Sequence, residues 1–140
     1  MVKIPNWLIY ALICSLLYGF SGFLGKLATK SIDYKTVFVY ETIGAILTTL
    51  FIFANSKDLS LDGNIAGIVS GLLIGVCGTA ASLIFLKSIE TGPVISVISI
   101  TSLYPVISVF LSYLFLKEAI TIPQFIALIL AIISVILSSY

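Results

Sequence analysis

The stretch GNIAGIVSGLLIGVCGTAASLIFL, residues 63–86, contains no charged side chain. About 20 apolar residues in an α-helix, each adding ~1.5 Å, cross the ~30 Å hydrocarbon core of a bilayer. This stretch is therefore long enough and apolar enough to span a membrane. Charged residues delimit four further apolar stretches of similar length, and Glu41 alone interrupts one of them: 4–25, 36–56, 91–116 and 119–140. The sequence predicts an all-α integral membrane protein with five transmembrane helices.

The composition supports this class and argues against others. Of 140 residues only 9 % are charged and 60 % are hydrophobic, and the mean hydropathy is +1.24, whereas a soluble domain carries about 25 % charge. We therefore expect neither an enzyme nor a nucleic-acid-binding protein. The chain has no His, and its seven basic residues are all Lys, so we expect no catalytic residue, no metal and no cofactor. Cys14 and Cys77 lie inside apolar runs and are interpreted as small packing residues.

Helix-boundary signals agree with the charge pattern. Asp33 is placed to cap the second helix, and Asp62-Gly63-Asn64 precedes the third. Pro93 and Pro123 fall in the first turns of the fourth and fifth helices, where a missing N–H costs little. All loops are short, so we expect residues 1–140 to form one five-helix membrane domain.

The distribution of lysines hardly favours either orientation of the chain in the membrane. With five helices, one side of the membrane receives Lys3, Lys57 and Lys117, and the other receives Lys26, Lys30, Lys35 and Lys87. Orientation follows an excess of Lys and Arg on one side, and here the excess is a single residue. Two interpretations stay open: one orientation set by other signals, or insertion in both orientations to give an antiparallel homodimer.

Small and polar residues mark two helix faces. Gly67, Gly71 and Gly75 recur every four residues, which favours close helix packing over a substrate surface. In the fourth helix Pro105 interrupts the hydrogen-bond pattern beside Thr101, Tyr104 and Ser108. A proline-broken helix with hydroxyl groups is typical of a cavity lining, because its backbone carbonyls become available to a ligand.

Glu41 is the one charged residue clearly inside a predicted span, on a face shared with Val37, Gly44 and Thr48. It lies roughly 7–8 Å along the helix axis from Thr36. One interpretation is an acid that reaches the lipid headgroups or pairs with Lys26, Lys30 or Lys35. The other is a proton or cation site facing a cavity, because ionisable groups inside a membrane bundle are functional candidates by default.

Several motifs resemble the EamA domain of the drug/metabolite transporter superfamily: LKSIETG at 86–92, SLYPV at 102–106, LKE at 116–118, QFIA at 124–127, Tyr18-Gly19 and Lys26-Leu27-Ala28. The likeness covers essentially the whole chain as one five-helix unit. Four positions depart from such patterns: Glu41 stands near the place of a frequent Arg, Ala127 and Ser134 replace glycines, and Tyr18 stands near a Glu of the smaller four-helix multidrug relatives. The resemblance therefore does not carry over the cation/proton exchange of those relatives. Most similar proteins fuse two such units into an inverted repeat, so the resemblance implies that a single unit is half of such a transporter and must pair.

These observations predict a multi-pass protein of the cell (inner or plasma) membrane that transports small solutes or metabolites. We expect a secondary transporter with alternating access, formed by two antiparallel copies in the lipid bilayer. Tyr18 and Tyr104 are candidates for stacking on a solute, and the other predicted cavity residues are Glu41, Thr48, Thr101, Pro105 and Ser108. Two alternatives stay open: half of a heteromeric flippase or transporter, and a membrane assembly subunit that transports nothing.

Overall fold

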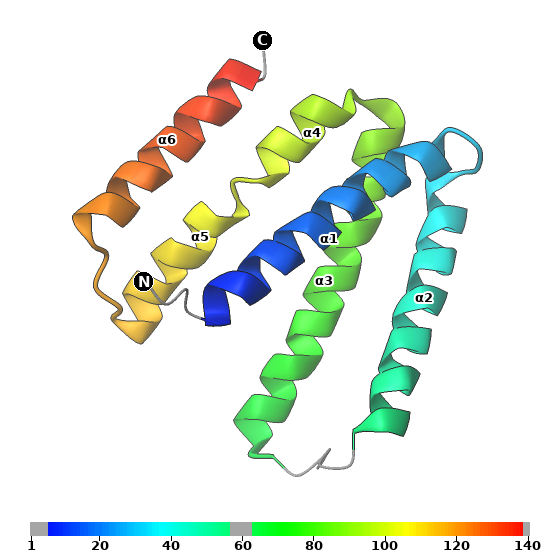
Figure 1. Ribbon diagram of the computed structural model, residues 1–140, viewed down its shortest axis with the longest axis horizontal. Helices are drawn as coiled ribbons and strands as arrows, with labels where there is room; N and C mark the ends of the chain where they lie inside the picture. Colours follow the sequence, from blue (N-terminus) through cyan, green and yellow to red (C-terminus); the bar gives the residue numbers. More distant parts are fainter. Residues whose placement is uncertain (1–5, 57–62, 139–140) are drawn as a thin grey trace. The chain divides into compact units, whose positions relative to one another are not determined.

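The computed structural model describes residues 6–56 and 63–138, and these residues are helical apart from short connections (Figure 1). The chain divides into two compact units, Met1–Thr91 and Gly92–Tyr140. Among the described residues, four apolar segments are long enough to cross a membrane, and one further apolar helix is shorter. The all-α prediction is therefore confirmed, and five apolar segments fit the predicted number, but the last falls short of the predicted spanning length.

The first unit contains three long helices, α1 (Asn6–Thr29), α2 (Tyr34–Asn55) and α3 (Ile65–Thr91). Helices α1 and α3 continue four and five residues beyond their predicted ends at 25 and 86. The charge pattern predicts that these two helices end just before Lys26 and Lys87. A long Lys side chain remains in a helix while its ammonium group reaches a polar region, so a charge ends the apolar stretch without ending the helix.

Both helix starts predicted in this unit have the expected caps. The Asp33 carboxylate accepts a hydrogen bond of 3.0 Å from the Lys35 backbone N–H at the start of α2. The Asn64 side-chain oxygen accepts one of 3.0 Å from the Gly67 N–H at the start of α3. Asp62 lies outside the described residues. Each cap satisfies one backbone donor that the first helical turn leaves without a partner.

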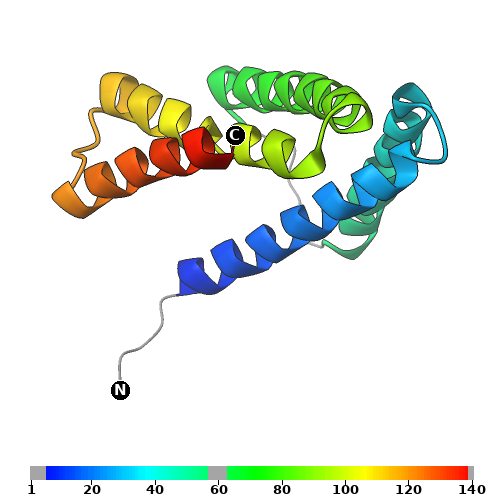
Figure 2. The ribbon, with the colours of Figure 1, turned by 90° about the horizontal axis from the view of Figure 1, so that it is seen from above.

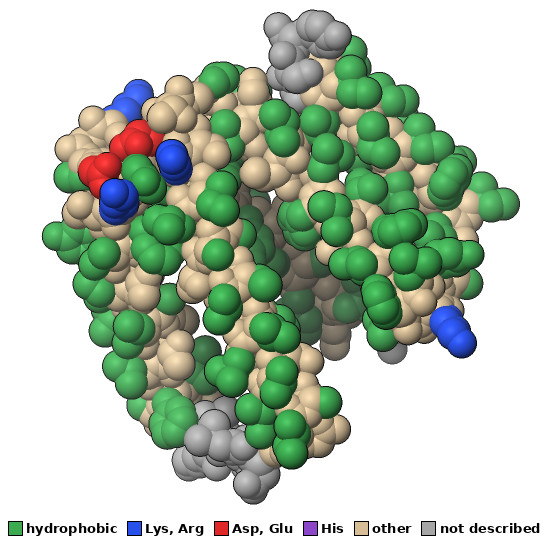
Figure 3. Space-filling view, turned by 180° about the vertical axis from the view of Figure 1, so that it is seen from behind, with side chains coloured by type: hydrophobic (Ala, Val, Ile, Leu, Met, Phe, Trp, Pro, Cys, Tyr) green, Lys and Arg blue, Asp and Glu red, His purple; other side chains and the backbone are tan. Residues whose placement is uncertain are grey.

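The core of the first unit lies at one end, where the turn between α1 and α2 meets the C-terminal end of α3 (Figures 1 and 2). The buried residues here are Gly22, Gly25, Val37, Leu86 and Ile89. A Cβ atom at Gly25 would lie 3.0 Å from Ile89 Cδ1, so glycine allows α1 to approach α3 closely. On the face that Figure 3 shows, charged side chains gather at the same end, and hydrophobic side chains are spread over the rest of the unit.

Two polar contacts close this end of the unit. The Lys26 ammonium group donates a hydrogen bond to the Ile89 carbonyl in the last turn of α3, and the Tyr34 N–H donates one of 3.1 Å to Glu90 Oε1. A cation at a helix C-terminus and an anion at a helix N-terminus both interact favourably with the helix dipole. The two contacts therefore fix the end of α3 to α1 and to α2.

In the second unit, the fourth span is predicted at 91–116 and is found at Val94–Leu116, but it is not one continuous helix. It consists of α4 (Val94–Thr101), α5 (Tyr104–Leu111) and a π-helical turn, η1 (Ser112–Leu116). The predicted break is present, but it falls at Ser102 and Leu103, because Pro105 occupies the first turn of α5. Pro93 is the residue before α4, and so lies one position earlier than predicted.

The last helix, α6 (Ile122–Ser138), has 17 residues, which corresponds to about 25 Å. It begins three residues later than the predicted start at 119. Lys117 adopts a left-handed conformation with φ 55°, which ends the π-helical turn. Gln124 Oε1 then accepts a 2.9 Å hydrogen bond from the Thr121 N–H, as in a capping box. These two local features determine where α6 starts.

Candidate functional site

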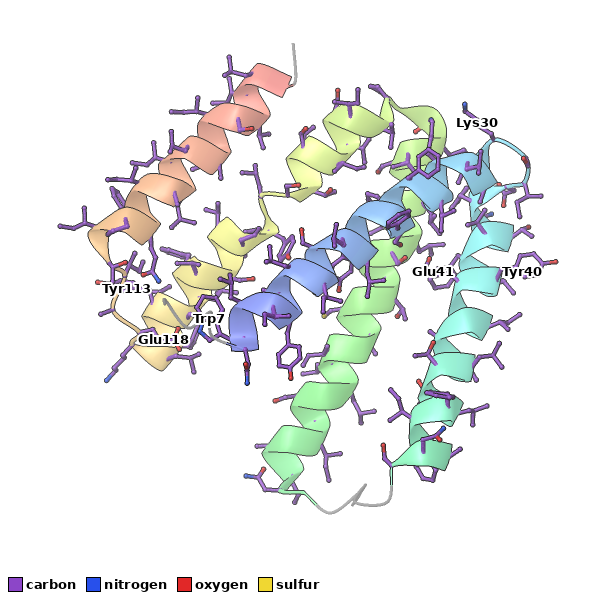
Figure 4. The ribbon with its side chains drawn as sticks, viewed as in Figure 1. Trp7, Lys30, Tyr40, Glu41, Tyr113 and Glu118 are labelled. Carbon is purple, nitrogen blue, oxygen red and sulfur yellow. The ribbon has the colours of Figure 1, made fainter. Side chains whose placement is uncertain are left out.

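A cleft between α2 and α3 contains the one acidic residue predicted inside a span. The Ser82 hydroxyl of α3 lies 2.6 Å from Glu41 Oε1 and 2.8 Å from Oε2 and donates to this carboxylate. Glu41 extends from α2 toward α3, whereas the neighbouring Tyr40 extends away from it (Figure 4). The cleft has a volume of about 160 Å³ and is lined by Phe38, Glu41, Thr42, Ala45, Gly78, Thr79 and Ser82.

Helical spacing explains why these side chains meet. Residues three, four and seven positions apart share a helix face, as Phe38, Glu41 and Ala45 do on α2. Gly78 and Ser82 do the same on α3, and a Cβ atom at Gly78 would meet nothing within 4 Å. Small side chains on two facing helices therefore leave the space in which the Glu41 carboxylate lies.

The glycines predicted to pack helices lie on the extension of this cleft. Gly71 and Gly75 precede Gly78 and Ser82 by seven residues each, which is two helical turns along the same face. A Cβ atom at Gly67, Gly71 or Gly75 would meet nothing within 4 Å, so none of the described residues packs on this face. Helix packing through the glycines stays a prediction and requires a partner outside the described chain.

Glu41 has a hydroxyl partner and, among the described residues, no lysine partner. The Lys26 ammonium group donates to the Ile89 carbonyl, and the Lys35 ammonium group lies 5.8 Å from the centre of the Tyr34 ring. Glu41 is seven residues from the start of α2 at Tyr34, or about 10 Å along the helix axis, and this depth carries a cost for a charged group. The structure thus shows Ser82 and no described lysine as its partner, while an acid that reaches the headgroups and an acid that faces a cavity both stay predictions.

The other residues predicted for a cavity in this unit do not line the cleft. Thr48 lies two turns beyond Glu41 on the same face of α2, and its hydroxyl donates a 3.0 Å hydrogen bond to the Gly44 carbonyl. Tyr18 lies on α1 and is 72 % exposed. Their roles stay predictions.

In the second unit the predicted site residues surround the α4–α5 break. Pro105 has no N–H, so the Thr101 carbonyl lacks its regular helical donor. The Val106 N–H donates to the Leu103 carbonyl at 2.9 Å, which leaves the Ser102 carbonyl outside the regular pattern too. Tyr104 and Ser108 are exposed on α5. The break therefore leaves the Thr101 carbonyl, as the sequence predicts, and also the Ser102 carbonyl without a regular helical donor, while contact with a solute stays a prediction.

A second cavity, of about 300 Å³, was missed by the sequence analysis. It is lined by Val109, Ser112, Tyr113, Glu118, Ala119, Ile120, Gln124, Ala127 and Leu128, and Figure 4 labels Tyr113 and Glu118. The signals available in the sequence were LKE at 116–118 and QFIA at 124–127, which flank the connection before α6. The π-helical turn and the left-handed Lys117, which shape the cavity, leave no signature in the sequence.

Comparison with known proteins agrees with this architecture. A profile of the EamA-like transporter family matches residues 5–140. An uncharacterized protein of Methanocaldococcus jannaschii is 30 % identical over 134 residues, which cover 94 % of this chain and 95 % of that protein. No solved structure matches. The family match and the long apolar helices together identify a multi-pass membrane protein, and the chain belongs to the EamA-like transporter family.

Proposed function

We propose that the chain is a secondary transporter of small solutes or metabolites that works as an antiparallel homodimer in the cell membrane. The family is one of transporters of the drug/metabolite type, and its profile covers nearly the whole chain as one unit. The observation that carries the proposal is the lysine balance of three against four. Since a one-residue excess gives almost no preference for either orientation, both insertions are accessible to the same sequence.

Two copies in opposite orientations recreate an inverted repeat without gene fusion. Inverted-repeat transporters hold their substrate near the middle of the bilayer, between the two halves, and expose it alternately as one half rocks against the other. The α4–α5 break supports this mechanism, because discontinuous helices with unpaired carbonyls form such sites. Transport, in place of a purely structural role, is further supported by the Glu41 carboxylate, which lies in a cleft between two apolar helices, since ionisable groups inside a membrane span are costly and mark functional sites.

The experiment is cysteine accessibility at Ser56, which follows the last residue of α2 and is exposed. Cys14 and Cys77 are first replaced by Ala, since both are exposed, and a Ser56→Cys variant is labelled with a membrane-impermeant maleimide from each side in turn. We expect comparable labelling from the two sides. Labelling from one side only contradicts the homodimer and favours pairing with a different, oppositely oriented protein.

A matched pair of variants shows whether both orientations are needed. Asn55→Lys with Ser56→Lys adds two charges at the end of α2, and Ser31→Lys with Ile32→Lys adds two at the turn before α2. The two double variants should bias insertion in opposite directions, and each should reduce transport when it is expressed alone. Co-expression of the two variants should restore transport. Full transport by either variant alone rules out a requirement for both orientations.

A further inference from the structure

The Glu41 carboxylate has unused capacity to bind a cation. An ionised carboxylate offers about four lone-pair positions, and among the described residues its partner is the single hydroxyl of Ser82. No described lysine neutralises it. The carboxylate lies about 10 Å along a membrane helix and has no positively charged partner among the described residues. It is therefore suited to bind a cation from solution.

The oxygen atoms available in the cleft match a primary ammonium group better than a hard metal ion. The hydroxyls of Thr42 and Thr79 donate to main-chain carbonyls of their own helices, at 2.9 Å to Phe38 and 2.9 Å to Gly75. Each hydroxyl that donates still has lone pairs to accept with, so the side-chain acceptors in the cleft are the two carboxylate oxygens of Glu41 and the hydroxyl oxygens of Ser82, Thr42 and Thr79. A primary ammonium group has three N–H donors, whereas hard cations take about six oxygen ligands.

The walls and the size of the cleft suit a short hydrocarbon chain on that ammonium group. Phe38, Ala45 and Gly78 supply carbon surface next to the carboxylate, and an aromatic ring near a cation adds an attractive contribution. The volume of about 160 Å³ is roughly five times the ~30 Å³ that one water molecule occupies in the liquid. Roughly five non-hydrogen atoms therefore fit.

We propose that the cleft between α2 and α3 binds a small primary alkylammonium ion, with its N–H groups on Glu41 and Ser82 and its carbon chain against Phe38, Ala45 and Gly78. This proposal names a substrate class for the transporter. It rests on the proposed function only in assuming that the bound ion is then transported. Binding itself requires just the two helices that form the cleft.

Three probes of equal size test the chemistry on the purified full chain in nanodiscs. n-Butylammonium, tetramethylammonium and n-butanol each have five non-hydrogen atoms, but the second lacks N–H donors and the third lacks charge. Dissociation constants are measured by ligand-observed NMR at neutral pH, where a primary amine is protonated. We expect n-butylammonium to bind with a constant on the order of 1 mM and at least tenfold more tightly than either other probe.

Variants of the cleft locate the binding. Glu41→Gln keeps an oxygen acceptor for Ser82 and removes the charge, and it should weaken n-butylammonium binding at least tenfold. Gly78→Val places a side chain in open space that lines the cleft, and should weaken binding by a similar factor without unfolding. The control is Gly19→Val on α1, which also enters open space and should leave the dissociation constant within twofold.

The proposal is overturned by unchanged n-butylammonium binding in Glu41→Gln, or by equal binding of tetramethylammonium and n-butylammonium. Failure of the proposed function is recognised separately, by one-sided labelling of Ser56→Cys. If Ser56→Cys is labelled from both sides but no ammonium ion binds, the proposed function stands and this substrate class is rejected. If labelling is one-sided but ammonium binding is specific, the binding site stands and the antiparallel homodimer is rejected.

Discussion

The two ends of the first unit differ sharply in how they are held together. At the closed end, defined by residues 22–37 and 86–91, α1, α2 and α3 bury Gly22, Gly25, Val37, Leu86 and Ile89 against one another. At the open end, defined by residues 6–19, 45–55 and 65–78, every described residue except Leu8 is exposed. The same three helices therefore form a tight joint at one end, and at the other they leave apolar faces that no described residue of this unit covers.

Glycine illustrates the difference between the two ends. Gly25 lies where a Cβ atom would touch Ile89, so its small size is used within the chain. Gly19, Gly67, Gly71 and Gly75 have open space where a Cβ atom would be. The closed end is stabilised by contacts within the chain, and the open end offers surface to lipid or to a second copy.

The largest effect is expected from filling the joint at Gly25. A Cβ atom there would lie 3.0 Å from Ile89 Cδ1 and 3.5 Å from Leu86 Cδ2, so Gly25→Leu overpacks the core and should destabilise the chain by about 2–3 kcal/mol. Reversible unfolding in mixed detergent micelles measures this change. Gly19→Leu, on the same helix in open space, is the control and should cost no stability or raise it by up to about 1 kcal/mol, because leucine is the better helix former. Equal losses in the two variants contradict the assignment of the joint.

A smaller effect is expected from removing the ammonium group that contacts the end of α3. Lys26→Met keeps the length of the side chain but removes the donor to the Ile89 carbonyl, and it should cost about 1–2 kcal/mol in the same unfolding measurement. Lys30→Met removes a charge from the same side of the membrane, so it changes the lysine balance equally. Lys30 is exposed, and we expect its replacement to be nearly neutral. If both variants lose a similar amount of unfolding free energy, the loss comes from the changed charge balance and not from the contact with Ile89.

The sequence predicted what is encoded locally and missed what depends on distant residues. The apolar stretches and the caps at Asp33 and Asn64 follow from neighbouring residues, and the break near Pro105 follows from one missing N–H. Ser82 as the partner of Glu41 is 41 positions away along the chain. No pattern within a single helix brings the two together, since the pairing depends on how α2 and α3 align.

The helix ends show the same limit. The charge pattern predicts helix ends at Lys26 and Lys87, but α1 and α3 continue to Thr29 and Thr91. For α1 a tertiary contact accompanies the extension, because the Lys26 side chain donates to a carbonyl on α3. The left-handed Lys117, which fixes the start of α6, likewise carries no signal, because lysine has no preference for that conformation.

A third prediction concerns the cap that Glu90 provides to α2. Its Oε1 atom accepts a 3.1 Å hydrogen bond from the Tyr34 N–H, and Glu90→Ala leaves that donor without its partner, at a cost of about 1 kcal/mol. Glu90→Gln keeps an acceptor oxygen and should recover most of the loss. Thermal unfolding followed by circular dichroism compares the two variants with the parent. Equal destabilisation by Ala and Gln shows that the charge, and not the hydrogen bond, is what matters at this position.

The smallest effect on folding is expected at the open end, from Gly71→Ala. Open space surrounds this position, so the added methyl group meets no described residue. The free energy of unfolding should rise by no more than about 1 kcal/mol, because alanine is the better helix former.

Association of two copies is expected to weaken in the same Gly71→Ala variant. If a helix of the second copy packs on the glycine face, a methyl group holds the two backbones apart and weakens dimerisation roughly fivefold, since about 1 kcal/mol corresponds to that factor. Energy transfer between labelled chains, diluted in lipid vesicles, measures the dissociation constant. The control is Ser70→Thr, which adds a methyl group about 100° around the same helix and should leave association unchanged. Equal association of Gly71→Ala and the parent shows that lipid, and not a second copy, covers this face.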